Sequence, residues 1–169
     1  MAGKWKGRRL KPPSDERVRP TADRVREAWM SIVQLDLPDA RVLDLFAGSG
    51  ALGIEALSRG AREVEFVELG ARSLAALRDN LQSVGAEAEA IVHRADAIKF
   101  AAKLSDGDFD VAFADPPYRL RLAEEIAALW LRKPFARVLG VEHEKTVELP
   151  ESRDRRVYGD TVVTFYRRP

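Results

Sequence analysis

The chain has 169 residues and a net charge of +1 at pH 7, which fits one globular domain and leaves little room for a separate substrate domain. Hydrophobic residues make up 46% and charged residues 33%, as in a soluble protein, and there is neither a membrane-length apolar run nor a secretory signal, so we expect a cytoplasmic location and no membrane contact. The lack of cysteine excludes disulfides, cysteine–zinc sites and a cysteine nucleophile, and two isolated histidines do not build a zinc centre, so we expect no metal.

The N-terminal segment is strongly basic although the whole chain is nearly neutral. Residues 1–26 carry nine Lys or Arg against three Asp or Glu, residues 27–152 carry 14 against 22, and residues 153–169 carry five against two. Two basic ends around an acidic middle favour an anionic partner, with a solubilising tail as the alternative. Trp and Gly between the basic residues favour nucleic acid as that partner. The arm residues expected to contact it are Lys4, Lys6, Arg8 and Arg9.

A helix is expected after the arm, with Thr21 or Asp23 as its cap and an end at Pro38. From there strands alternate with helices, which implies a parallel, doubly wound sheet covered on both faces. A Gly-Asp turn at 159–160 between two β-rich runs predicts a C-terminal antiparallel hairpin. We therefore expect a basic arm over 1–20 and one α/β domain over 21–169 with a mostly parallel, seven-stranded Rossmann-like sheet. The apolar face of the first helix is Val25, Ala28, Trp29, Ile32 and Val33, the strands are 41–46, 63–68, 90–93, 109–114, 138–144 and the hairpin within 157–166, and the later helices are 51–58, 71–84, 97–104 and 121–131.

A glycine-rich loop follows the first strand, at the sheet edge where doubly wound proteins bind ligands. Gly48, Gly50 and Gly53 fit the pattern G-x-G-x-x-G between a strand and a helix, and Glu68 ends the next strand. The glycines allow a tight turn and close backbone approach, while the carboxylate can accept hydrogen bonds from both hydroxyls of a ribose. These features are consistent with a nicotinamide or flavin dinucleotide and equally with S-adenosylmethionine.

Asp44 favours one of these two classes of ligand, because it lies within the first strand just before the loop. A carboxylate there would repel a pyrophosphate and attract the ammonium and sulfonium of S-adenosylmethionine, whose own carboxylate can face the helix N-terminus at 49–51. Asp96, after the third strand, can accept a hydrogen bond from an adenine amine, with a helix cap as the alternative reading. Three carboxylates after successive strands favour S-adenosylmethionine as the cofactor.

Asp115-Pro116-Pro117-Tyr118 follows the strand 109–114 at the same edge. Two prolines after a strand can simply break the chain, but the group also suits the exocyclic amine of a nucleobase, whose lone pair is delocalised into the ring. The Asp115 carboxylate and the Pro116 carbonyl can each accept one amine hydrogen, and Tyr118 can stack on the base. The group predicts amine methylation by positioning and electrostatics, without a metal, on a base turned out of its helix or loop.

With these residues the chain resembles the Rossmann-like class I methyltransferases, and among them the bacterial 16S rRNA guanine-N2 methyltransferase family. The glycine motif and Asp-Pro-Pro-Tyr are shared by many amine methyltransferases, whereas Arg-Pro-Thr-Ala-Asp-Arg-Val-Arg-Glu at 19–27 is the specific signal. The resemblance spans nearly the whole chain. The segments that carry it are 2–8, 19–27, 43–53, 55–60, 115–118 and 158–160.

The resemblance implies S-adenosylmethionine as cofactor, the N2 amine of a guanine in 16S rRNA or an assembling small subunit as substrate, and a monomeric enzyme. One departure is Leu69, which follows Glu68 where the family often has a charged residue. Another is the arm, whose missing apolar start predicts a shortened initial β-strand. The implied catalytic residues are Asp115, Pro116 and Tyr118; the cofactor residues are Asp44, Phe46, Gly48, Ser49, Gly50, Glu68, Asp96 and Ala97; the further RNA-contacting residues are Arg19, Thr21, Arg24 and Arg26. The arginines among the last four could also close over the cofactor, and a capped helix with an exposed polar face is the alternative.

Three other functions remain open from the sequence. An amine methyltransferase acting on adenine N6 of DNA or RNA or on a protein glutamine commonly has Asn in place of Asp115, and most lack this arm. A dinucleotide-dependent oxidoreductase would hold a pyrophosphate beside Asp44. A non-catalytic protein that kept the fold would bind rRNA without transferring a methyl group.

Overall fold

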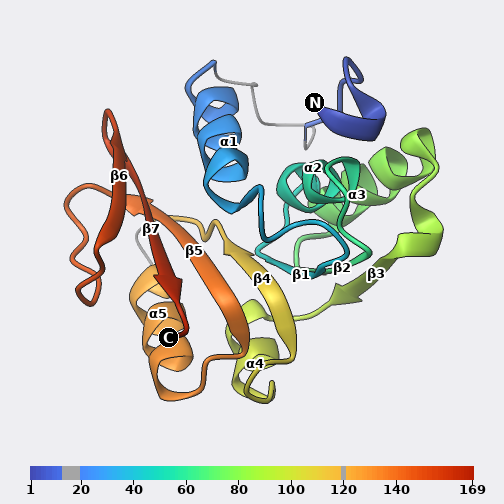
Figure 1. Cartoon of the computed structure of the whole chain (residues 1–169). Helices are drawn as coiled ribbons and strands as arrows, with labels where there is room; N and C mark the ends of the chain where they lie inside the picture. The colour runs from blue at the N-terminus through green and yellow to red at the C-terminus, as the bar shows by residue number, and fades with distance from the viewer. Residues whose placement is uncertain (13–19, 119–120) are drawn as a thin grey trace.

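A mixed seven-stranded sheet forms the centre of the molecule (Figure 1). The computed structural model describes residues 1–12, 20–118 and 121–169, without the side chains of Pro20 and Thr21. The strand order is β3-β2-β1-β4-β5-β7-β6; β1 to β5 are parallel, and β7 is antiparallel to both β5 and β6. This confirms the expected α/β sheet with its C-terminal hairpin. The strands are β1 (Arg41–Leu45), β2 (Glu63–Glu68), β3 (Ala90–Arg94), β4 (Phe109–Ala114), β5 (Ala136–Glu144), β6 (Asp154–Tyr158) and β7 (Thr161–Arg167).

Helices cover both faces of the sheet, as Figure 1 shows. Side chains of β4 alternate between two hydrophobic clusters: Val111 and Phe113 pack with α1, α2 and α3 on one face, while Ala112 packs with α4 and α5 on the other. Both faces of the central strands are therefore buried, which explains their continuous apolar sequence. The helices are η1 (Gly3–Trp5), α1 (Pro20–Val33), α2 (Ala51–Ser58), α3 (Ala71–Val84), η2 (Glu87–Glu89), α4 (Ala97–Ala102) and α5 (Leu122–Arg132).

A glycine in β5 allows α1 to lie close to the sheet. The Trp29 ring of α1 packs edge-on against Phe113 at 5.6 Å and Phe165 at 6.1 Å between ring centroids. A Cβ at Gly140 would stand only 2.5 Å from Trp29 Nε1 and 2.9 Å from Phe165 Cε1. The absence of a side chain at Gly140 therefore sets where α1 crosses the sheet.

The N-terminal segment packs along α2 and α3 instead of adding a strand. The Trp5 side chain is buried, and the backbone N–H of Trp5 donates to Ser58 Oγ at 2.9 Å. Asn80 of α3 accepts from Lys11 N at 2.7 Å and donates to Lys11 O at 2.8 Å and to Ser49 O at 3.0 Å. The expectation of a shortened initial strand is wrong for residues 1–12, because the turn at η1 directs Trp5 onto α2.

Element ends differ from expectation where sequence signals are weak. Helix α1 starts at Pro20 and ends at Val33, so Thr21 and Asp23 lie in its first turn instead of capping it, and Pro38 lies beyond its end. Proline fits the first helical position because its N–H needs no partner there. Strand β1 ends at Leu45, since Phe46 has a left-handed φ of 56°. Among the described residues, no helix has the length and apolar character needed to cross a bilayer.

Candidate active site

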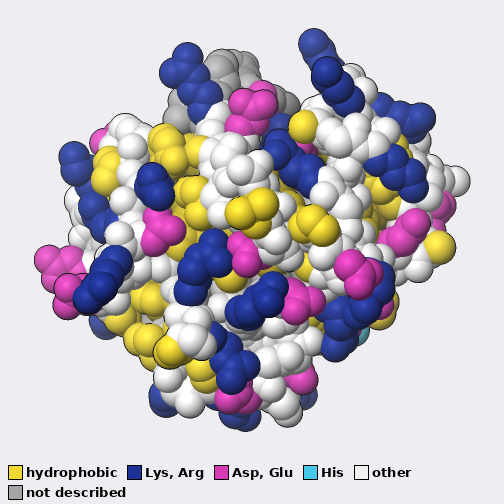
Figure 2. Space-filling model, in the orientation of Figure 1, with side chains coloured by type: hydrophobic (Ala, Val, Ile, Leu, Met, Phe, Trp, Pro, Cys, Tyr) yellow, Lys and Arg dark blue, Asp and Glu magenta, His cyan; other side chains and the backbone are white. Residues whose placement is uncertain are grey.

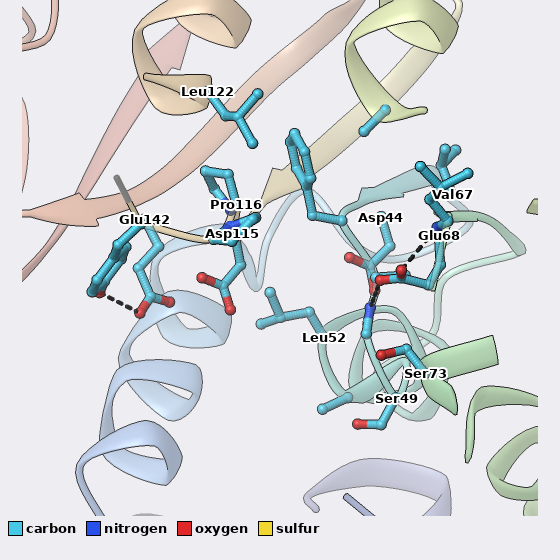
Figure 3. Close-up of a pocket in the computed structure, with 18 of the residues that line it drawn as sticks. Asp44, Ser49, Leu52, Val67, Glu68, Ser73, Asp115, Pro116, Leu122 and Glu142 are labelled. Atoms are coloured by element: carbon cyan, nitrogen blue, oxygen red, sulfur yellow. Dashed lines mark hydrogen bonds between the residues drawn. The ribbon is translucent and has the colours of Figure 1, made fainter. Parts of the chain in front are cut away.

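A cavity of about 1340 Å³ opens at the carboxyl ends of the parallel strands. Figure 3 shows its side chains converging from β1, β2, β4 and β5 and from the helix that follows β1. Parallel strands present their carboxyl ends at one edge, so residues distant in sequence meet there. The cavity brings together most of the expected site residues, namely Arg26, Asp44, Phe46, Gly48, Ser49, Glu68, Asp96, Ala97, Asp115, Pro116 and Tyr118.

The three motif glycines have two different roles. A Cβ at Gly50 would stand 2.3 Å from Leu77 Cδ1, and one at Gly53 would stand 2.3 Å from Phe66 Cε1. These two glycines let α2 pack tightly, and Gly50 is not among the residues that line the cavity. Gly48, with φ of 58°, has no atom within 4 Å of such a Cβ in the described chain. Its missing side chain therefore leaves room for a ligand to approach the backbone.

Glu68 fixes the shape of the loop. Its Oε1 accepts from Gly48 N at 2.8 Å, and its Oε2 accepts from Leu69 N at 2.8 Å and Gly70 N at 2.7 Å. Oε2 uses both of its lone pairs in these bonds, whereas Oε1 accepts only one bond and keeps a lone pair for a hydroxyl. The backbone thus holds Glu68 in place at the cavity wall before any ligand binds.

Asp44 is the most buried charged side chain of the site. It is 1% exposed, and its Oδ2 accepts from Gly53 N at 2.9 Å. Burial raises the pKa of Asp44 well above its ordinary value, and the negative charges of Asp115 and Glu68 raise it further. A cation in the cavity would reverse this effect, whereas a pyrophosphate would increase it. The electrostatics therefore favour S-adenosylmethionine over a dinucleotide.

Asp96 both caps a helix and lines the cavity, two roles that were alternatives from the sequence. Its Oδ1 accepts from Lys99 N at 2.9 Å and caps α4, as a helix-capping aspartate does. Asp96 and the buried Ala97 also line the cavity. The cap orients the carboxyl group at the cavity wall, so the structural reading and the ligand-binding reading are compatible.

The Asp-Pro-Pro-Tyr group at 115–118 lines the same cavity as the glycine-rich loop that follows β1. Pro116 is buried, whereas Asp115 is exposed and Tyr118 is 40% exposed. The Tyr118 hydroxyl donates to Glu142 Oε1 at 3.5 Å and lies 3.3 Å from Thr161 Oγ1. Burial is the main cause that raises the Tyr118 pKa, so the phenol keeps its proton at neutral pH.

Glu142 is a site residue that the sequence reasoning missed. It lies near the end of β5 and lines the cavity, and Figure 3 shows its carboxyl group next to that of Asp115. Burial, followed by the charge of Asp115, raises the Glu142 pKa to about 8. The available signal was its place at the carboxyl end of a parallel strand. The adjacent His143 points elsewhere: it is 2% exposed and bonds Thr164 Oγ1 at 2.8 Å.

The basic arm residues do not line the cavity. Lys4, Lys6, Arg8 and Arg9 are exposed on the segment that covers α2 and α3. Figure 2 shows Lys and Arg side chains over this segment, at the upper right of the face drawn. In α1, Arg24 is exposed, and Arg26 lines the cavity with Nη2 2.8 Å from Asp23 Oδ1. Arg19 lies outside the described residues, and so does the side chain of Thr21.

Methyltransferases that use S-adenosylmethionine share this sheet and this placement of the loop, and the chain is one of them. A family described as Conserved hypothetical protein 95 matches residues 1–167, and the chain belongs to that family.

Relatives of known name or structure agree with this assignment. The Ribosomal RNA small subunit methyltransferase D of Haemophilus influenzae is 35% identical, over 99% of this chain and 90% of that protein. The solved structure of Escherichia coli yhhF is 34% identical with a TM-score of 0.85, covering 99% of this chain and 96% of that one. The Thermus thermophilus 16S rRNA N2 G1207 methyltransferase, solved with AdoMet and guanosine, shares the fold at 20% identity and a TM-score of 0.71, covering 92% of this chain and 45% of that one.

Proposed function

We propose that the chain transfers a methyl group from S-adenosylmethionine to the N2 amine of a guanine in the 16S rRNA of the small ribosomal subunit. The observation that carries the proposal is that one cavity holds both the Gly48 loop and the Asp-Pro-Pro-Tyr group. The Haemophilus influenzae relative, named for small-subunit rRNA, supports RNA as the acceptor because it is similar over nearly the whole chain.

The cofactor end of the cavity suits a ligand that is cationic and carries a ribose. Bound S-adenosylmethionine supplies an electrophilic methyl group on a sulfonium. Asp44 provides negative charge next to the loop, and Glu68 Oε1 keeps one lone pair as an acceptor for a ribose hydroxyl. We assign the ligand's carboxylate to the backbone at Ser49, before the N-terminus of α2, and its adenine to Asp96 and Ala97, with Phe46 and Gly50 shaping the loop.

The acceptor end must make a poor nucleophile reactive. The Asp115 carboxylate and the Pro116 carbonyl accept the two amine hydrogens, which localises the nitrogen lone pair for attack in line with the methyl group. Tyr118 stacks on the base and fixes its plane. A guanine inside a helix or packed loop must leave its stack to reach Asp115, so the proposal requires the base to be turned out.

We assign the basic arm and α1 to the surrounding RNA. Lys4, Lys6, Arg8, Arg9 and Arg24 are exposed and can meet phosphates, and Arg26 stands at the cavity itself. In this proposal Arg19 and Thr21 contact RNA as well. In this proposal the enzyme is a monomer that acts in the cytoplasm on an assembling subunit.

The direct test uses the protein with labelled S-adenosylmethionine and unmodified small-subunit RNA or particles, followed by mass spectrometry of the nucleosides. N2-methylguanosine is the expected product. N6-methyladenosine, or a methylated protein glutamine, would replace the proposed acceptor with one of the other amines.

Replacing the proposed amine acceptor gives a sharper test. Asp115→Ala should leave S-adenosylmethionine binding within about threefold and lower methyl transfer by at least ~100-fold, because positioning of the amine is lost. Asp79→Ala, at an exposed site on α3, is the control and should transfer normally. Normal turnover by Asp115→Ala would show that the amine is held elsewhere.

A further inference from the structure

Glu142 places a second carboxyl group beside the residue proposed to hold the amine. It comes from β5, whereas Asp115 and Tyr118 come from the loop after β4, and the two strands are paired neighbours. Figure 3 shows the carboxyl groups of Glu142 and Asp115 next to each other and pointing into the cavity. A side-chain hydrogen bond between them is among the causes that raise the pKa of Glu142. Glu142 Oε1 also accepts from the Tyr118 hydroxyl at 3.5 Å. The loop is thus linked to β5 through one carboxyl group.

A hydrogen bond between two carboxyl groups requires a proton on one of them. Glu142 is the more enclosed of the two, since Asp115 is exposed and Glu142 is not. A neutral acid is favoured at the more buried position, where an anion loses more hydration. The raised pKa of Glu142, about 8, agrees with a proton that stays there at neutral pH.

We propose that Glu142 is a positioning residue, neutral when the site is active, whose O–H donates to one Asp115 oxygen and turns the other toward the substrate amine. This inference rests on the proposed amine methylation and extends it to the group that orients Asp115. The bond keeps Asp115 anionic, because Glu142 holds the proton that the pair shares. Deprotonation of Glu142 would place two anions side by side and displace Asp115.

Titratable and charged groups face Glu142 from several neighbouring elements. Asp115 and Tyr118 face Glu142 from the loop after β4. Thr161 of β7 contacts the Tyr118 hydroxyl. From α1, Arg26 lines the same cavity and is paired with Asp23. Asp44 titrates at the cofactor end and would contribute equally to the wild-type protein and to variants of Glu142.

Two variants distinguish the ionisation of Glu142 from its hydrogen bonds. Glu142→Gln keeps an N–H donor toward Asp115 and an acceptor for Tyr118 but cannot ionise, and Glu142→Ala keeps neither. Glu148→Gln, an exposed carboxyl on the segment after β5, is the matched control. The kcat/KM for methylation of small-subunit RNA is measured from pH 6.5 to 9, with S-adenosylmethionine binding and melting temperature as checks on folding.

The expected wild-type kcat/KM falls about tenfold between pH 7 and 9, as one acid with a pKa of about 8 ionises. Glu142→Gln should stay within about threefold of wild type at pH 7 and lose this alkaline fall, while Glu142→Ala should be at least ~100-fold slower throughout. Glu148→Gln should follow the wild type. An unchanged alkaline fall in Glu142→Gln, or an inactive Glu142→Gln that still binds S-adenosylmethionine, would overturn the inference; if the alanine variant does not fold, the glutamine comparison decides alone.

A readout without any acceptor distinguishes failure of this inference from failure of the proposed function. Carbon-13 NMR of labelled glutamate carboxyls can follow the titration of Glu142 in the full chain. Its pKa should fall toward the ordinary value of 4.5 in Asp115→Asn, where the neighbouring charge is gone. An unshifted titration would refute the carboxyl pair even if guanine were methylated, and a shifted one would support it even if another amine were the acceptor.

Discussion

Asp44 shows the conflict between stability and binding at the scale of one residue. Its carboxyl group is 1% exposed and stands near the charges of Asp115 and Glu68, so the free protein disfavours its ionised form. A carboxyl group whose pKa is higher folded than unfolded costs stability as the pH rises from its unfolded pKa toward its folded one. We attribute this cost to the need for negative charge beside a cationic cofactor.

Asp44→Asn should therefore raise the melting temperature of the free protein at pH 8 and weaken S-adenosylmethionine binding. The amide oxygen can still accept from Gly53 N without carrying a buried charge. We expect at least a tenfold loss of affinity by calorimetry, equivalent to about 1.4 kcal/mol. The stability gain should shrink as the pH approaches the ordinary Asp44 pKa of 3.8. If Asp44→Asn melted at a lower temperature than the wild type both at pH 8 and near the ordinary Asp44 pKa, the Asp44 carboxyl group would instead stabilise the free protein.

Candidate site residues could be found from the sequence where each lay at or next to the end of its strand. Asp44, Glu68, Asp96 and Asp115 all occur where a short apolar run gives way to a loop, and they line one cavity. Glu142 was missed because no glycine or proline after it marks a loop, and its role depends on the loop that follows the neighbouring strand β4. Such cross-strand proximity leaves no local pattern.

At the scale of elements, the crossing of α1 over β5 depends on Gly140. Gly140→Ala should destabilise the fold by about 1–3 kcal/mol, because the new Cβ would overlap the Trp29 ring and force it away. Urea unfolding measures the loss. Combining it with Trp29→Phe, which removes the overlapping indole nitrogen, should cost less than the sum of the two single changes. Simple additivity would show that the contact with Trp29 is not the cause.

Elements with strong local signals could be predicted closely, and those shaped by pairing could not. Helices α2 and α3 and strands β2 and β4 have the expected bounds, since glycines and apolar periodicity mark their ends. Strand β5 begins at Ala136, two residues before its expected start, because Ala136 pairs with Phe109 of the neighbouring strand β4. Pairing between strands is not encoded in the segment itself.

At the scale of the molecule, the docked arm forms a basic surface beside the cavity. Replacing Lys4, Lys6 and Arg9 by Gln should weaken RNA binding and flatten its salt dependence by up to about 0.9 logarithmic units for each phosphate that the protein no longer neutralises. S-adenosylmethionine binding should stay unchanged, since none of the three lines the cavity. Titrations of small-subunit RNA at several salt concentrations give both quantities.

The matched control removes the same charges from the opposite edge of the sheet. Lys103, Arg132 and Lys133 are exposed and precede the strands β4 and β5, away from the cavity. Their replacement by Gln should leave the salt dependence of RNA binding nearly unchanged. Equal losses in the two triple variants would indicate attraction by net charge alone, without a contribution from the arm.

The composition of the arm could be read from the sequence, whereas its docking could not. Charge counts identify a basic segment, but Trp5 finds its place only once α2 has folded and Ser58 is available. Asn80 likewise joins Lys11 to Ser49 across long separations in the chain. Contacts of this kind arise from the tertiary fold.

The strand order has a consequence for synthesis on the ribosome. Strand β7 follows all the other strands in the sequence yet lies between β5 and β6, with Val163 and Phe165 buried. During translation one edge of β5 stays unpaired until β7 leaves the exit tunnel, and unpaired strand edges are prone to aggregation. Thr161, the partner of Tyr118, arrives with the same strand. A nascent chain that stops before β7 would therefore hold every proposed cofactor residue and still lack Thr161, so this contact of the Tyr118 hydroxyl forms only after the last strand has emerged.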